Sequence, residues 1–147
     1  MDNRICRAKS LDTGEWVYGY YVSKTDPLLG CAHPYILCQE YNSDTGLLDS
    51  FIFWCRVDSD TVCRYTGKKD KNGVDIFEND IIDASDEEWY AAGPAGHDSP
   101  IILVEWSDYY CGFDPFSNYD CDCGVYIDAN GCKVIGNIFD NPKLIEG

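Results

Sequence analysis

A short acidic segment holds the first side chains whose spacing could support chemistry. Four carboxylates fall within "YTGKKDKNGVDIFENDII", residues 65–82; they are Asp70, Asp75, Glu78 and Asp80. A calcium loop of the EF-hand type needs oxygen ligands at alternate positions followed by a distal Glu, and that spacing is absent here. Short acidic side chains also accept hydrogen bonds from backbone amides in turns. We therefore expect Asp70 and Asp80 to hold turns rather than a ligand.

Cysteines are the second group with possible chemistry. Cys121 and Cys123 lie in "CDCG", with Cys111 before them and Cys132 after them. Zinc sites usually pair cysteines two to four residues apart, whereas one residue separates this pair, and the adjacent carboxylates would add negative charge beside thiolates. A zinc site, and with it a metal-dependent hydrolase, is the weakest alternative. We predict no metal ligand and no cofactor.

The remaining thiols suggest packing rather than catalysis. The chain has nine cysteines, an odd number, and its N-terminus lacks the apolar stretch of a signal peptide. We expect buried reduced thiols at Cys6, Cys31, Cys38, Cys55, Cys63 and Cys132. Cys31 and His33 could share a strand face, but a nucleophile also needs an orienting group and an oxyanion site, for which no signature exists. We predict no catalytic residue and no enzyme activity.

Aromatic side chains are the remaining conspicuous group. Trp16, Trp54 and Trp106 fall in predicted strands, where a core or half-buried position is the simplest expectation. Trp89 and Tyr90 fall in a predicted loop beside three acidic residues. Because Trp and Tyr are enriched in interface hot spots, this pair could anchor a partner. It could equally fold back over the protein.

The elements that must position these residues are short strands separated by turns. Turn sequences at 12–14, 42–46, 71–73 and 129–131 lie between segments rich in Val, Ile, Tyr, Phe and Trp, which is a hairpin signature. The first predicts a hairpin of 4–9 with 15–22. The second predicts a hairpin of 35–40 with 48–57.

Later segments continue this pattern. Strands are predicted at 61–65, in "VDIF", from Ile81 and Ile82 onward, and at 101–107, while 84–100 has the composition of a long loop. An irregular stretch precedes "VYIDANGCKVIGNIF", which reads as a terminal hairpin, and "DNPKLIEG" reads as a turn or short helix. The chain is predicted to be mainly β, with an N-terminal β-hairpin module at 1–60 and a second small β-barrel at 61–147.

Charge limits the possible partners. The formal net charge is −15, from 11 basic and 26 acidic residues. Nucleic-acid affinity comes largely from Lys and Arg, so direct nucleic-acid binding by so acidic a chain is disfavoured. No apolar run approaches the roughly 20 residues that span a bilayer. We expect a cytoplasmic protein that does not bind membranes.

Three blocks of the sequence resemble the YopX-like family of phage and prophage proteins. The strongest is "TVCRYTGKKDKNGVDIFENDII", and "RAKSLDTGEWVYGYYV" and "KVIGNIFDNPKLIEG" resemble the family's opening and ending. The structural signature comprises Tyr65, Thr66, Gly67, Asp70, Asn72, Gly73, Ile76, Phe77, Asp80, Gly136, Asn137, Asn141 and Pro142. Asn79 stands where glycine is usual, and Asn tolerates left-handed backbone better than other non-glycine residues.

The resemblance implies a β-rich protein whose C-terminal part is a Src-homology-3-like small barrel, encoded by a phage or prophage and acting in a bacterial host cell. It implies no catalytic residue. The leading hypothesis is a non-enzymatic module that binds a protein partner or self-associates. The second is an acidic DNA mimic that inhibits a host nucleic-acid-binding protein. Its carboxylates would be Asp83, Asp86, Glu87, Glu88, Asp108, Asp114, Asp120 and Asp122.

Overall fold

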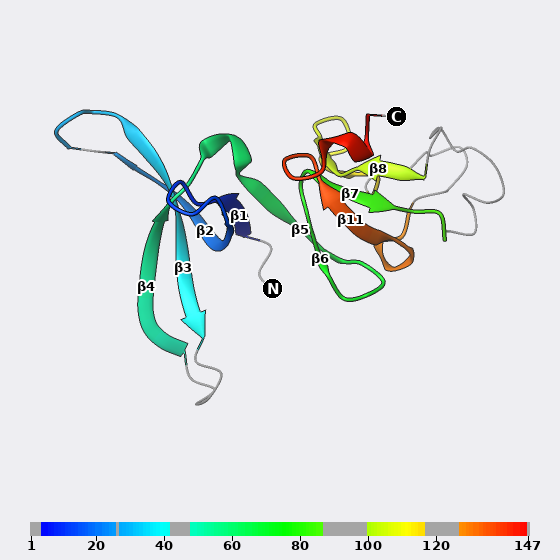
Figure 1. Ribbon diagram of the computed structural model, residues 1–147, viewed down its shortest axis with the longest axis horizontal. Coiled ribbons are helices and arrows are strands. Elements are labelled where there is room, and N and C mark those ends of the chain that lie inside the picture. The colour runs from blue at the N-terminus through cyan, green and yellow to red at the C-terminus, as the bar shows by residue number, and fades with distance from the viewer. Residues whose placement is uncertain (1–3, 26, 42–47, 87–99, 117–126, 147) are drawn as a thin grey trace. The chain divides into compact units, whose positions relative to one another are not determined.

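The computed structural model describes residues 4–25, 27–41, 48–86, 100–116 and 127–146, with the backbone alone at 39–41 and 48–53. These residues form 11 strands and three short 3-10 helices, without an α-helix among them (Figure 1). The prediction of a mainly β protein is therefore confirmed. The chain divides into two compact units, Met1–Tyr65 and Thr66–Gly147.

The first unit is an antiparallel meander. Its strands are β1 (Ile5–Lys9), β2 (Trp16–Thr25), β3 (Ala32–Tyr41) and β4 (Leu48–Arg56). Each pairs with the next, and β1 also pairs with the start of β5 (Cys63–Lys69). The full sheet has the order β4-β3-β2-β1-β5-β6, where β6 is Asp75–Phe77. Both predicted N-terminal hairpins are confirmed.

One face of this meander carries the first hydrophobic core. Cys6 and Ala8 of β1 pack with Ile36 of β3 and with Val57, and Val17 adds a partly buried contact. Because side chains alternate across a strand, the neighbours of these core residues in β1, β2 and β3 lie on the opposite face of the sheet.

Close approach of two strands requires a glycine in the middle of β2. Gly19 lies opposite Cys6 of β1, and a Cβ placed on Gly19 would overlap the backbone carbonyl of Leu37 in β3. A side chain at this position would therefore force the two strands apart.

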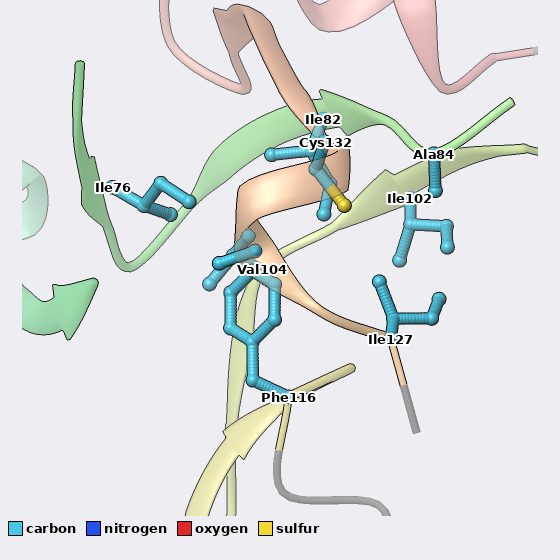
Figure 2. Packing of buried hydrophobic residues seen from close by; sticks show 9 residues of the cluster. Ile76, Ile82, Ala84, Ile102, Val104, Phe116, Ile127 and Cys132 are labelled. Carbon is cyan, nitrogen blue, oxygen red and sulfur yellow. The ribbon is translucent and has the colours of Figure 1, made fainter. Parts of the chain in front are cut away.

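The second unit contains two small sheets and its own core. Its strands are β6, β7 (Asp80–Asp83), β8 (Ile101–Leu103), β9 (Glu105–Ser107), β10 (Gly112–Asp114) and β11 (Lys133–Asn137). One sheet has the order β11-β7-β8, and β9 pairs with β10. Figure 2 shows the side chains of this core, which come from β6, β7 and β8 and from the segments that follow or connect the strands.

Several details of the second unit differ from the sequence prediction. The strand predicted at 101–107 is two strands, because the buried Val104 interrupts it, and β10 lies in a stretch expected to be irregular. The predicted terminal hairpin is wrong in the described part of the chain: Ala129–Gly131 is a 3-10 turn, and β11 pairs with β7. The predicted short helix at the C-terminus is confirmed as Pro142–Leu144.

Asp70 shows how the acidic segment at 65–82 holds the fold. Its side chain is 4% exposed and accepts hydrogen bonds from three backbone amides: Asn72 at 2.8 Å, Val74 at 2.9 Å and Val134 of β11 at 3.0 Å. Burial alone would raise the pKa of Asp70, but the amides of Val134, Val74 and Asn72 outweigh it and lower the pKa. Asp70 therefore joins the turn to a strand far away in the sequence.

The rest of the segment has a similar structural role. The carboxylate of Asp80 is 1% exposed and accepts a hydrogen bond from the amide of Phe77 at 2.8 Å. Asn79 has a φ of 69°, so the chain is left-handed where the family usually has glycine, as expected for an asparagine there. Ile76 and Ile81 are fully buried.

A second set of polar residues closes the C-terminal turn. The side-chain oxygen of Asn137 accepts hydrogen bonds from the amides of Phe139 at 3.0 Å and Asp140 at 2.9 Å. Asn141 lies over Gly136 so closely that a Cβ there would come within 2.5 Å of the Asn141 Oδ1 atom. Gly136, Asn137 and Asn141 thus form one interlocking turn.

Candidate functional site

The site residues predicted as possible partner anchors, Trp89 and Tyr90, lie outside the described residues, as do Cys121 and Cys123. Of the two outer thiols of the considered zinc set, Cys132 is buried in the second core. No group of three His, Cys, Asp or Glu side chains suited to a metal occurs in the described part of the chain.

Two other predictions for thiols and tryptophans need correction. Cys31 is exposed, because it precedes β3 in a loop instead of lying within the strand, and His33 instead contacts Arg56. Trp54 is 51% exposed and Trp106 is 39% exposed, so neither is a core residue. Trp54 lies on the face of β4 opposite the first core, a distinction that its residue type does not encode.

Exposed aromatic residues gather on the face of the first sheet opposite its core. Strand pairing places Lys9 across from Trp16, Arg7 across from Tyr18, Lys24 across from His33, and Leu37 across from Trp54. We call this surface the cation-aromatic face. Its members are Arg7, Lys9, Trp16, Tyr18, Tyr20, Lys24, His33, Tyr35, Trp54 and Arg56. Arg7 is buried, and Trp16, His33 and Tyr35 are half-buried.

Cations and rings alternate on this face. The Arg7 guanidinium lies 4.5 Å from the centre of the Trp16 ring, and the Lys24 ammonium lies 5.2 Å from the centre of the Trp54 ring. Tyr35 meets Trp54 edge to face, with ring centres 6.0 Å apart. Such contacts hold cations beside aromatic surface without neutralising their charge.

A small hollow lies at one end of the face. It has a volume of about 190 Å³ and is lined by Lys24, Thr25, Pro27, His33 and Tyr35. The hollow thus brings an ammonium, an imidazole and a phenol together at the end of the β2–β3 pair.

The tautomer of His33 follows from its neighbour. Arg56 Nη2 lies 3.0 Å from His33 Nδ1. A guanidinium can only donate, so Nδ1 accepts and the ring hydrogen sits on Nε2. His33 therefore adds a third donor group, its Nε2–H, to the Lys24 ammonium and the Arg56 guanidinium, a set suited to an oxyanion.

The charge of this face is opposite to that of the whole chain. The described side chains of β1 to β4 include Arg7, Lys9, Lys24 and Arg56 and contain no Asp or Glu. The net charge of the sequence conceals this local reversal. The sequence shows Trp16, Tyr18, Tyr20 and Lys24 at every-second-residue spacing, which places them on one face of a strand. It does not show that this face is the one exposed to solvent.

The carboxylates considered for DNA mimicry have local partners where they are described. Asp83 accepts a hydrogen bond from the amide of Ser85 at 2.9 Å, and Asp86 pairs with Lys71 at 2.5 Å. Bonding to the Ser85 side chain and amide lowers the pKa of Asp83. Glu87, Glu88, Asp120 and Asp122 lie outside the described residues.

Comparison with protein families gives a match over nearly the whole chain. The model described as YopX protein matches residues 7–146. The chain belongs to the YopX family. A crystal structure of the protein EF1440 from Enterococcus faecalis is similar to it, with 22% sequence identity, a TM-score of 0.48, and coverage of 95% of this chain and 96% of that one.

Two searches gave a negative result. No curated protein matches the sequence. In the part of the chain that the structure describes, no helix is long and apolar enough to cross a membrane.

Proposed function

We propose that this YopX family protein is a non-enzymatic binding module and that the cation-aromatic face is its contact surface. The observation that carries the proposal is the exposure of large aromatic side chains on a face free of described carboxylates: Tyr18 is 47% exposed, Tyr20 40% and Trp54 51%. Rings of this kind, adjacent to cations, are typical of binding hot spots. The second unit, as a Src-homology-3-like small barrel, would serve as the scaffold.

The contact surface is separate from the residues that hold the fold. Trp54 and Lys24 contact each other and face solvent, whereas the first core uses the other side of the same strands. Substitutions on the face should therefore change binding with little loss of stability.

The test compares retention of proteins and nucleic acids from a bacterial lysate, together with sedimentation of the purified protein. The face variant combines Lys24→Gln with Trp54→Ala. The matched control combines Lys143→Gln with Tyr109→Ala, at exposed positions of the second unit. We expect the wild type and the control to retain a partner from the lysate or to self-associate. The face variant should lose that binding or self-association. Equal behaviour of all three proteins would refute the proposal.

A further inference from the structure

The cation-aromatic face holds the two kinds of group that a single nucleic-acid strand requires. Proteins that bind single strands combine cations along the backbone with aromatic rings on which bases stack. Lys24 and Arg56 supply the cations at one end of the face, and Tyr35 and Trp54 supply rings between them.

Strand pairing sets these groups in neighbouring rows. Tyr35 lies directly across from Arg56, and Lys24 directly across from His33. Directly opposed residues on one sheet face have Cβ atoms about 5 Å apart. A base and its adjacent phosphate could thus contact a ring and a cation at the same time.

The length of β2 fits several nucleotides. Its ten residues extend roughly 33 Å at about 3.3 Å each. Aromatic side chains at Trp16, Tyr18 and Tyr20 continue the row of rings away from the hollow. A surface of this length agrees with single-strand sites of about 4 to 16 nucleotides.

The net charge of −15 opposes the binding of a nucleic-acid strand to this face only weakly. Repulsion between exposed charges is screened beyond about 8 Å at physiological ionic strength, so cations in direct contact outweigh distant carboxylates. Stacking on rings is attractive at any salt concentration. The cations and rings of this face then supply the attraction.

We propose that the cation-aromatic face binds a single strand of nucleic acid, with phosphates on Lys24 and Arg56 and a base stacked on Trp54. This rests on the proposed function, because it names the ligand of the same surface. The Lys24 ammonium, which lies over the Trp54 ring, moves to the phosphate when a base takes its place. A chain of carboxylates such as polyglutamate would use the cations but offers no flat ring to stack on the aromatic row.

Fluorescence anisotropy with a labelled single-stranded DNA of about 12 nucleotides tests this directly. The same RNA strand, the DNA duplex and polyglutamate serve as competitors. We expect single strands to compete well, and duplex and polyglutamate poorly. Trp54→Ala should weaken binding about tenfold or more, with Trp54→Phe recovering part of the loss.

The cation contribution is measured separately. In Lys24→Gln, the slope of log affinity against log salt concentration should become shallower by about 0.7. Because Lys24 is exposed, its substitution should not disturb the fold. Lys143→Gln and Tyr109→Ala should bind as the wild type does.

Each contrary result overturns the nucleic-acid assignment in a distinguishable way. Equally tight polyglutamate binding would identify an acidic protein as the ligand and leave the proposed contact surface standing. Nucleic-acid binding that persists in both Trp54→Ala and Lys24→Gln would place the strand elsewhere. If no probe binds and the lysate partners are the same for wild type and face variant, both proposals fail.

Discussion

The two units of this protein use polar residues in different ways. Residues 1–65 contain six of the 11 basic residues and nine of the 26 acidic ones, so most of the acidic excess lies in residues 66–147. In the first unit, the exposed cation of Lys24 lies against the exposed ring of Trp54 on one sheet face. In the second, carboxylates such as Asp70 and Asp80 are buried and hold turns. The net charge of the chain therefore describes the second unit and not the first.

The buried carboxylates of the second unit stabilise its fold, whereas the exposed rings and cations of the first unit form a surface. A buried carboxylate that accepts several amides is costly to remove because it leaves those donors unsatisfied. An exposed ring or cation can be removed at little cost to folding. Substitutions should thus damage the second unit's fold through its acids and the first unit's binding through its cations and rings.

The largest expected effect is on the first sheet itself. Gly19→Ala should destabilise the first unit by about 3 kcal/mol or more, because the added Cβ overlaps the Leu37 carbonyl. Urea unfolding followed by tryptophan fluorescence measures this. Ser23→Ala, at an exposed position of the same strand, is the control and should unfold as the wild type does. Wild-type stability in Gly19→Ala would mean that β2 and β3 do not approach as described.

The next effect is on the second unit. Asp70→Ala should cost about 3 kcal/mol, since three backbone amides lose a charged acceptor. The Val134 amide should exchange its hydrogen faster in this variant, because it loses its bond to the Asp70 carboxylate. Asp75→Ala, which removes an ion pair with the largely exposed Lys69, should have a much smaller effect. Equal effects of the two substitutions would contradict a special role for Asp70.

The pH dependence of the second unit follows from the same carboxylate. The pKa of Asp70 is lowered in the folded state, so the unfolded chain binds its proton more readily. This contribution to stability is complete above the unfolded pKa and disappears as the pH falls through the folded pKa. Acid unfolding of wild type and Asp70→Ala should therefore converge at low pH. A constant difference between them at all pH values would refute this assignment.

The smallest effect concerns thiol reactivity. Burial and a contact with Cys55 raise the pKa of Cys38 to about 12, so very little of this thiol is ionised at pH 8. Exposed Cys31 and Cys111 should be alkylated first, and the partly buried Cys38 much later. Mass spectrometry of briefly alkylated native protein gives the order. Early modification of Cys38 would show that the first core is open.

Residues that form turns made much of the fold predictable from the sequence. The site could not be predicted, because the sequence does not show which side of each strand is buried. Repeated Gly, Asn and Asp residues located both N-terminal hairpins and the Asp70 turn, because these residue types form turns through local bonds. The pairing of β11 with β7 depends on contacts distant in the sequence. The exposure of Trp54 depends on which side of a strand the core occupies, and its residue type favours neither.

The most direct test of the contrast between the units is an NMR titration of ¹⁵N-labelled protein with a single-stranded DNA of about 12 nucleotides. The account predicts chemical-shift changes in the amides of β1, β2 and β3 and at Trp54 and Arg56, with the Trp54 indole among the strongest. The turn around Asp70 should remain unchanged. Shifts centred on the second unit, or none at saturating DNA, would contradict the claim that the first unit presents the binding surface.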